Sequence, residues 1–313
     1  MAATDTTLPD AAGNWADRLP APLRPYARLA RWDRPIGWQL LMWPCWWSTV
    51  LAWPHAPETG WTTVAWYLAL FAIGAFAMRG AGCTYNDIVD RDLDARVART
   101  RHRPLASGRV SVKRAALFMG LQALLGLLVL LQFNGATIRL GLASLLVVAL
   151  YPFAKRVTHW PQAVLGVAFS WGALVGWSAL VGGLDAAPLA LFAGSVFWVV
   201  SYDTIYAHQD REDDREAGIG STALRFGDRT GVWLGGLYTA ATLCLALALV
   251  LAAAPWPAWI GLAAFAAMLA WQVRDLDIDD ADACLRLFRR NHPAGSFLFL
   301  GLLLAALWDR LPL

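Results

Sequence analysis

Charged side chains are scarce in this chain. Of its 313 residues, 16% are Asp, Glu, Lys or Arg, whereas 58% are hydrophobic. Soluble globular domains carry about 25% charged residues, so the composition excludes an ordinary soluble protein and indicates a membrane protein. The formal net charge is only +3. This small value gives no reason to expect a nucleic acid as a partner.

Two kinds of segment are also absent. Residues 1–22 contain no basic stretch followed by a short apolar one, so we expect no cleaved signal peptide there. They are rich in Ala, Thr, Asp and Pro, and we expect them to form a mobile cytoplasmic N-terminus. No Ser/Gly linker or low-complexity tract interrupts the remainder, which predicts a single membrane domain over residues 23–313. The four cysteines show no spacing typical of a metal site.

Long apolar runs dominate the rest of the chain. Nine of them are long enough to span the roughly 30 Å hydrocarbon layer of a bilayer, namely residues 37–54, 62–83, 115–134, 137–153, 161–181, 187–206, 231–253, 256–273 and 294–309. Many of the 18 tryptophans lie near the ends of these runs, as is typical of side chains at the membrane interface. The sequence therefore predicts an all-α integral membrane protein with nine transmembrane helices.

Basic residues divide unevenly between the two predicted sides of the membrane. If the N-terminus is cytoplasmic, only Arg139 and Arg310 of the loop and terminal cations lie outside. An excess of Lys and Arg marks cytoplasmic loops. We therefore expect a multi-pass protein of the inner (cytoplasmic) membrane with its N-terminus inside and its C-terminus outside.

Two acidic clusters follow apolar runs on the predicted cytoplasmic side. In the first, Asp87, Asp90 and Asp94 fall at positions i, i+3 and i+7 if the preceding helix continues. That spacing places them on one helical face, with Asp92 pointing elsewhere. Carboxylates beside a membrane core are costly and by default indicate function.

The second cluster has a similar pattern. Asp203, Asp210 and Asp214 fall at i, i+7 and i+11, with Tyr206 beside them. Two such faces opposed across a cavity would supply carboxylates from both sides. Magnesium is held by one or two carboxylates together with substrate phosphates. The pair of clusters therefore predicts Mg²⁺ ions that bridge a diphosphate, with nearby cations such as Arg91, Arg103 and Lys155 neutralising the remaining phosphate charge.

Other interpretations of these acids differ in what they require. Each cluster alone is compatible with a solvated, salt-bridged helix end, which is also our interpretation of the acidic loop at 274–293. A calcium-binding loop beginning at Asp90 would need glycine and glutamate where Ala95 and Arg101 stand. A phosphatidyl-alcohol transferase would need further acids downstream, but residues 97–115 contain none. His208 is expected to be an ordinary loop histidine rather than a ligand or base.

From about residue 27 to residue 310 the chain resembles the UbiA family of intramembrane prenyltransferases. The family motif Asn-Asp-x-x-Asp-x-x-x-Asp is matched by Asn86, Asp87, Asp90 and Asp94. The stretch 99–105 is similar to the family's Arg-x-x-Arg-Pro-Leu segment, and residues 203–222 resemble its second motif. The segments 34–37, 151–156 and 160–162 resemble those of the branch that prenylates 4-hydroxybenzoate.

The resemblance implies nine helices around a central cavity that opens to the cytoplasm. It implies Mg²⁺-dependent transfer of a polyprenyl chain from polyprenyl diphosphate to 4-hydroxybenzoate in ubiquinone biosynthesis. The alternative acceptors are homogentisate and a naphthoate. An ion-coupled transporter is a less favoured alternative, because transporters place acids at the membrane midplane in broken helices. The implied catalytic and metal-binding residues are Asp87, Asp90, Asp94, Asp210 and Asp214. The implied substrate-binding residues are Asn86, Arg91, Arg103, Lys155, Arg156, Arg34, Asp203 and Tyr206.

An acceptor that carries a carboxylate needs a cationic partner in the protein. We expect Arg156 to take this role, with Arg34 as the second candidate. Both arginines are equally compatible with anchoring at the cytoplasmic membrane surface. Arg156 also follows Lys155, which leaves a role in diphosphate binding open.

Overall fold

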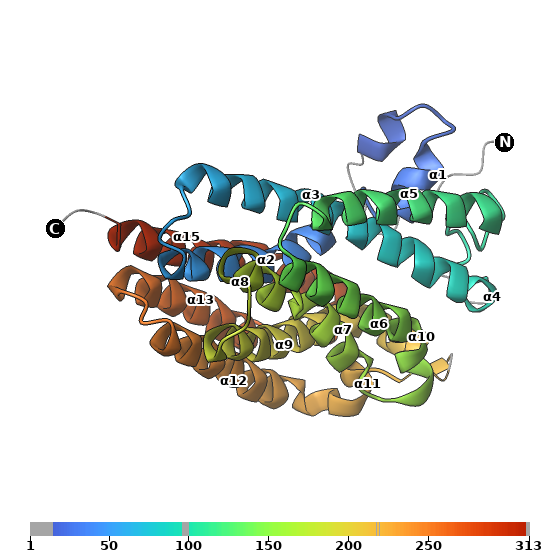
Figure 1. The fold of residues 1–313 in the computed structure, drawn as a ribbon. Helices are drawn as coiled ribbons and strands as arrows, with labels where there is room; N and C mark the ends of the chain where they lie inside the picture. Colours follow the sequence, from blue (N-terminus) through green and yellow to red (C-terminus); the bar gives the residue numbers. More distant parts are fainter. Residues whose placement is uncertain (1–14, 96–99, 217, 219, 311–313) are drawn as a thin grey trace. The chain divides into compact units, whose positions relative to one another are not determined.

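The computed structural model describes residues 15–95, 100–216, 218 and 220–310, apart from the side chains of Lys155, Arg156 and Asp213. Residues 1–14, part of the expected mobile N-terminus, lie outside the described residues. Over the described ranges the chain is helical and contains no strand (Figure 1). The predicted all-α membrane class is therefore confirmed.

The longer helices are α2 (Ile36–Ala52), α3 (Trp61–Val89), α5 (Val112–Leu130), α6 (Gly135–Val157), α7 (Pro161–Ser170), α8 (Gly172–Val181), α9 (Ala186–Ala207), α12 (Thr230–Leu251), α13 (Trp256–Arg274) and α15 (Asn291–Trp308). Short helices and 3-10 turns connect them: η2 (Trp15–Arg18), α1 (Arg24–Leu29), η3 (Trp53–His55), α4 (Arg91–Asp94), η4 (His208–Asp210), α10 (Arg211–Glu216), α11 (Thr222–Phe226), η5 (Gly227–Arg229) and α14 (Ala281–Arg289).

Eight helical segments within the described residues are long and apolar enough to cross a membrane. They correspond to the second through ninth apolar runs of the sequence, so the protein is a multi-pass membrane protein. The first predicted run forms α2, which has 17 residues and continues into the 3-10 turn η3. At 1.5 Å per residue α2 alone is about 26 Å long, slightly shorter than a typical span.

The chain divides into two compact units. The first comprises Met1–Trp38 and Gly74–Leu128, and the second comprises Gln39–Ile73 and Val129–Leu313. In the first unit, Leu29, Leu105, Val110 and Ala115 form a buried apolar cluster beneath the loop that follows α4. Because Gly80 has no side chain, the Gln122 side chain of α5 lies directly against α3.

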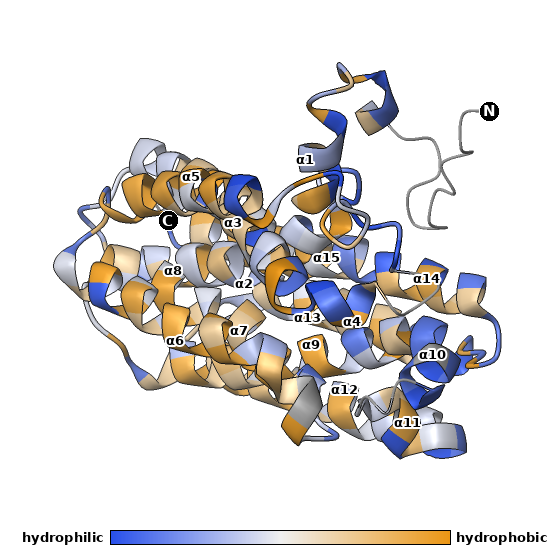
Figure 2. Ribbon diagram, turned by 90° about the vertical axis from the view of Figure 1, so that its right-hand side faces the viewer, coloured by the Kyte–Doolittle hydropathy of each residue, from blue (hydrophilic) through white to orange (hydrophobic). Residues whose placement is uncertain are grey.

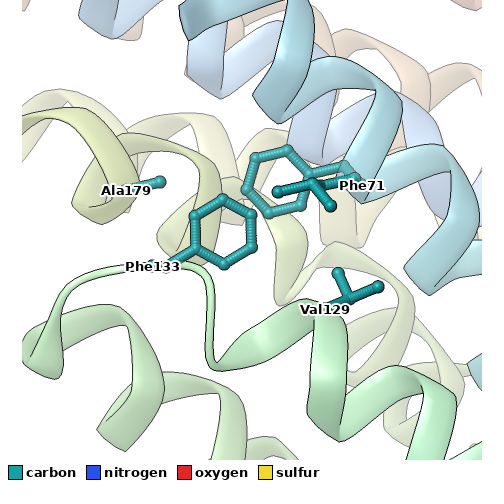
Figure 3. Close-up of a cluster of buried hydrophobic side chains, with 5 residues drawn as sticks. Phe71, Val129, Phe133 and Ala179 are labelled. Atoms are coloured by element: carbon teal, nitrogen blue, oxygen red, sulfur yellow. The ribbon is translucent and has the colours of Figure 1, made fainter.

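The centre of the second unit is aromatic. Trp47 of α2, Trp198 of α9 and Phe265 of α13 are fully buried, with the two tryptophan rings 4.9 Å apart. In Figure 1, α9 runs between α7 and α12 and packs along both. A second cluster, in Figure 3, joins Phe71, Phe133, Val129 and Ala179, with the two phenylalanine rings stacked at 4.8 Å.

A buried hydrogen-bond network links four helices of this unit. Tyr238 donates to the Gln272 side chain at 3.0 Å, and the Asn291 amide donates to the same oxygen at 3.0 Å. The indole of Trp198 donates to Asn291 Oδ1 at 2.8 Å. Polar side chains are costly in a membrane unless they are paired, and this network pairs them while joining α9, α12, α13 and α15.

The span over residues 161–181 is broken between α7 and α8. Gly172 and Gly176 lie so close to α2 that an added Cβ would meet Cys45 atoms within 2.5 Å. The Ser48 hydroxyl donates to the carbonyl of Ala173 across this contact. The break lies between Ser170 and Gly172, and helix breaks are common at Gly and Ser pairs. The missing side chains of Gly172 and Gly176 therefore let α2 approach the α8 backbone closely, next to the break.

At the far end of α2, Arg310 closes the turn η3. Its guanidinium donates to the carbonyls of Thr59, Trp53 and Ala56 at 3.1–3.2 Å. It also stacks over the Trp53 ring, 4.5 Å from the ring centroid. Arg310 thereby adds a second hydrogen bond to carbonyls that also accept from the Ala56 N–H, the Thr59 N–H and the Trp53 indole.

Large apolar side chains are exposed along several helices. On α5, Leu117 is 68% exposed, and on α6, Leu146 is 71% exposed. Figure 2 shows α6 and α12 mostly in hydrophobic colours, whereas α4 and α10 are hydrophilic. Extended apolar surface of this kind is unusual for a soluble monomer and is what lipid contact requires.

Candidate active site

The first acidic cluster lies where α3 ends. The helix stops at Val89, but the backbone N–H groups of Asp90 and Asp94 still donate to Asn86 and Asp90 at 2.9 and 2.8 Å. The chain thus keeps helical bonding through α4. This explains why Asp87, Asp90 and Asp94 are all buried, at 1%, 0% and 6% exposure. The Asp92 side chain is 78% exposed, so the predicted division of the acids between two faces is confirmed.

Two arginines hold the buried carboxylates of this cluster. Arg31 Nη2 donates to both oxygens of Asp87, at 2.8 and 3.0 Å. Arg103 Nη1 donates to Asp94 at 2.8 Å and to Asp87 at 3.3 Å. Arg103 was expected near these acids because of its position in the sequence, whereas Arg31 was not.

The charges of this group act on one another. Burial alone would lower the pKa of the Arg31 guanidinium, but Asp87, Cys83 and Asp33 together outweigh burial and raise the pKa above its ordinary value. Burial raises the pKa of the Asp94 carboxyl, and the Arg103 guanidinium opposes this shift. The arginines therefore stabilise the charged form of carboxylates that burial would otherwise disfavour.

The remaining predicted site residues of the first unit are Arg91, Asn86 and Arg34, and they differ in exposure. The Arg91 side chain is 47% exposed and pairs with Asp92 at 2.9 Å. Asn86 lies half-buried on the last turn of α3. Arg34 is mostly buried, with 17% of its side chain exposed, and its Nε lies 3.7 Å from Asp33.

The second acidic segment continues α9 through the turn η4 into α10. Asp203, Asp210 and Asp214 are all half-buried along it. The Tyr206 ring packs on Phe288 of α14, with the ring centroids 4.7 Å apart. The segment therefore presents the predicted acids from one continuous helical path.

Buried hydroxyl groups fasten this segment to the loop that follows it. The hydroxyls of Thr204 and Thr222 are 2.7 Å apart, and the Thr222 backbone N–H donates to Gln162 of α7 at 3.0 Å. One turn later, His208 Nε2 lies 3.1 Å from the hydroxyl of Thr230. His208 is buried in the 3-10 turn η4, and the expectation that it is neither a ligand nor a base stays a prediction. These hydrogen bonds fix the end of α9 against the starts of α11 and α12.

The third acidic loop is a salt-bridged surface, as expected. Asp279 pairs with Arg211 at 3.1 Å, and Asp275 pairs with Arg274 at 2.9 Å. Asp280 caps α14 by accepting from the N–H groups of Asp282 and Ala283. The N–H of Ala283 is the main reason why the pKa of Asp280 is below its ordinary value. The Arg211–Asp279 pair joins this loop to α10.

The donor set suits magnesium, which prefers oxygen ligands. Among the described residues, no three His, Cys, Asp or Glu side chains already converge on one point. In the first cluster, Arg31 and Arg103 pair with Asp87 and Asp94. The two acidic clusters belong to different units, so their opposition across one cavity stays a prediction. Lys155 and Arg156 were predicted site residues, but their side chains lie outside the described part of the chain.

The chain is similar to known proteins over most of its length. The model of the UbiA prenyltransferase family matches residues 41–306. The mitochondrial 4-hydroxybenzoate polyprenyltransferase of Drosophila melanogaster is 50% identical over 291 residues, which cover 91% of this chain and 72% of that protein. The enzyme of the same name from Homo sapiens is 46% identical over 293 residues, covering 93% of this chain and 78% of the human one.

Solved structures show the same fold at lower identity. A UbiA homologue from Aeropyrum pernix K1 superposes with a TM-score of 0.69 at 22% identity, over 85% of this chain and 97% of that one. A UbiA homologue from Archaeoglobus fulgidus bound to GPP and Mg²⁺ superposes with a TM-score of 0.62 at 19% identity, over 91% of this chain and 99% of that one. With a family match over residues 41–306 and identities near 50% to curated relatives, the chain belongs to the UbiA prenyltransferase family.

Proposed function

We propose that this protein is a 4-hydroxybenzoate polyprenyltransferase of ubiquinone biosynthesis. It transfers a polyprenyl chain from its diphosphate to the ring carbon ortho to the acceptor hydroxyl. The allylic C–O bond breaks, a C–C bond forms, and diphosphate and a ring proton leave. The observation that carries the proposal is the 46–50% identity to enzymes of this name over 91–95% of the chain.

Magnesium is the cofactor that we propose. The Archaeoglobus fulgidus homologue is bound to Mg²⁺ together with a prenyl diphosphate, and the buried carboxylates here offer the oxygen donors that Mg²⁺ requires. Asp87, Asp90, Asp94, Asp210 and Asp214 would hold it. When bound, it would neutralise charge that develops on the departing diphosphate.

The protein's own groups provide the rest. We assign the diphosphate oxygens to Arg103, Lys155 and Arg91, because guanidinium and ammonium groups pair well with phosphate. The allylic fragment carries positive charge after the C–O bond breaks and must be kept from water. Apolar helices exclude water, and aromatic faces such as that of Tyr206, which packs on Phe288, stabilise cations.

The acceptor carboxylate is assigned to Arg156, with Arg34 as the alternative. A guanidinium can form two parallel hydrogen bonds with a carboxylate. Arg34 is mostly buried and already lies near Asp33, so a substrate carboxylate would have to compete with that side chain. This competition favours Arg156.

The proposed membrane is the inner one, with the N-terminus and the active site on the cytoplasmic side. The basic-residue asymmetry supports this orientation, and both acidic clusters then open to the compartment that holds soluble 4-hydroxybenzoate and magnesium.

Product analysis tests the function directly. Membranes containing the protein are supplied with Mg²⁺, 4-hydroxybenzoate and a mixture of prenyl diphosphates, and the products are identified by mass spectrometry. We expect 4-hydroxybenzoate that has gained one polyprenyl chain. Prenylation of homogentisate or a naphthoate, but not of 4-hydroxybenzoate, would assign a sister activity. Solute uptake into sealed vesicles without release of diphosphate would instead indicate a transporter.

A further inference from the structure

Arg31 has an unusual backbone for its residue type. Its φ of 57° lies in the left-handed region, which among the described non-glycine residues only Ala253 shares. The N–H of Trp32 donates to the carbonyl of Ala27 at 2.9 Å, and the N–H of Arg31 donates to that of Arg28 at 3.2 Å. This is the helix-ending turn in which glycine usually occupies the left-handed position. The backbone alone would therefore favour glycine at residue 31.

The side chain of Arg31 makes hydrogen bonds that glycine could not make. Its Nη1 donates to the carbonyl of Arg28 at 2.7 Å, which anchors the guanidinium to its own turn. Its Nη2 then contacts both oxygens of Asp87. The Arg31 side chain is 15% exposed and that of Asp87 is 1% exposed, so this ion pair is little screened by water.

The contact engages both carboxylate oxygens of Asp87, the atoms that would coordinate a metal ion. A divalent cation that coordinates both oxygens of Asp87 must take the place of Arg31 Nη2. Arg103 similarly bridges Asp87 and Asp94. Two guanidinium groups thus lie among three buried carboxylates, and their positive charge opposes the approach of a metal cation.

A prenyl diphosphate changes this balance, because it brings phosphate oxygens with which a displaced guanidinium can pair. We propose that Arg31 makes metal binding at Asp87 conditional on the diphosphate, by holding the carboxylate until the substrate offers the guanidinium an alternative partner. The inference rests on the proposed function. It identifies Arg31 as a residue that couples the binding of the metal to that of the diphosphate.

Such coupling is a reciprocal free energy and can be measured by binding alone. The test uses purified protein in nanodiscs and two affinities. The first is that for Mn²⁺ alone, a substitute for Mg²⁺ whose unbound ion gives an EPR signal. The second is that for radiolabelled farnesyl S-thiolodiphosphate, a poorly reactive substrate analogue, with Mn²⁺ and with chelator.

The main variant is Arg31→Gly, because glycine removes the guanidinium and suits the left-handed backbone. We expect it to bind Mn²⁺ alone about 5- to 150-fold more tightly than the unmodified protein, the usual range for coupled sites. The gain in analogue affinity that Mn²⁺ produces should shrink by a similar factor. Arg31→Lys keeps a charge but loses the two-oxygen contact, so it should lie between the two.

Two control variants match the change. Ala253→Gly alters the other left-handed turn, which has the same hydrogen bonds between Ala254 and Leu249 and between Ala253 and Val250. Arg28→Gln removes a cation of α1, three residues before Arg31. The Arg28 side chain pairs with Asp17, outside the acidic cluster. Neither should change either affinity. Thermal unfolding of every variant checks the fold, and Arg31→Lys serves as the test if Arg31→Gly unfolds.

The outcomes separate the two proposals. An affinity for Mn²⁺ alone that stays equal or becomes weaker in the Arg31 variants overturns the coupling role, and Arg31 is then a structural ion pair. If the unmodified protein binds the analogue no better with Mn²⁺ than with chelator, the metal–diphosphate function itself fails, and the coupling role fails with it.

Discussion

At the scale of single residues, burial distinguishes acids that the sequence places side by side. Asp90 is fully buried, whereas the Asp92 side chain is 78% exposed and pairs with Arg91. Carboxylates are taken out of water in a membrane protein only where something compensates for their lost hydration. The buried and exposed members of one short segment therefore have different roles, which substitution can separate.

We expect Asp90→Asn to lower turnover at least about 100-fold, equivalent to about 2.7 kcal/mol of transition-state stabilisation. The amide keeps the shape of the side chain but loses the charge that attracts a metal. Prenyl transfer is measured in membranes at limiting Mg²⁺, with the protein level followed by immunoblot. Asp210→Asn should behave alike. The control Asp92→Asn should retain near-normal turnover. Near-normal turnover in both test variants would remove these residues from the site.

For the acceptor, Arg156→Ala should raise the Michaelis constant for 4-hydroxybenzoate far more than that for the prenyl diphosphate. A charge-assisted hydrogen bond contributes about 1.5–3 kcal/mol, which corresponds to a roughly 10- to 150-fold effect. Arg156→Lys should recover only part, because lysine cannot make the planar two-pronged contact. Steady-state kinetics with each substrate varied in turn provide the measurement. A larger effect on the prenyl substrate would assign Arg156 to the diphosphate and leave the carboxylate to Arg34.

The sequence predicted this site in part. Spacing alone identified Asp87, Asp90 and Asp94 as one face, because helical periodicity is local. Arg31 escaped prediction because its contact with Asp87 joins residues 56 positions apart. A glycine at residue 31 would have predicted the helix-ending turn, but an arginine gives no such signal. The positive charge of Arg31 was attributed to the cytoplasmic surface together with that of the neighbouring basic residues.

At the scale of elements, the end of α9 is held by hydroxyl groups. Thr204 donates to the carbonyl of Val200 at 2.6 Å, so its contact with Thr222 requires the Thr222 hydroxyl to donate. Both side chains are fully buried. Asp203 and Asp210 flank this point on the same helical path, so we expect the Thr204–Thr222 contact to position them.

We expect Thr204→Val to reduce the free energy of unfolding by about 1–2 kcal/mol, because it leaves the buried Thr222 hydroxyl without its acceptor. Thr204→Ser should restore most of the loss. Denaturant titration of the protein in mixed micelles gives the free energies. Thr242→Val is the matched control, since among the described residues the Thr242 hydroxyl bonds only to the carbonyl four residues earlier, that of Tyr238, at 2.9 Å. Equal losses in both valine variants would contradict a special role for the Thr204 contact.

The helices themselves were largely predictable, and their interruptions were not. Long apolar runs must form helices in a bilayer, since every backbone group needs a partner there. The break before Gly172 depends instead on the approach of α2, more than 120 residues earlier in the chain. The buried network of Gln272 and Asn291 likewise joins separate spans, so each residue appeared as an isolated polar side chain in the sequence.

At the scale of the whole molecule, the distribution of basic residues predicts the topology. We expect a cysteine at Ser107, which is exposed in the loop before α5, to be protected from a membrane-impermeant thiol reagent added from the periplasmic side. A cysteine at Gly135, exposed at the start of α6, should react. The background lacks the four native cysteines, and permeabilised cells show that both sites are reactive. The reverse pattern would invert the proposed orientation.

The contact between Arg310 and η3 has a consequence for biosynthesis. The carbonyls of Trp53, Ala56 and Thr59 leave the ribosome early, but the guanidinium that satisfies them arrives about 250 residues later. During translation this turn has only its local hydrogen bonds, from the N–H groups of Ala56 and Thr59 and the indole of Trp53, while the later spans insert. Only a nascent chain that has delivered its last helix to the membrane can close this turn. Premature termination upstream of Arg310 would leave the turn η3 without its three guanidinium hydrogen bonds, and we expect such a chain to be more susceptible to proteolysis at this turn.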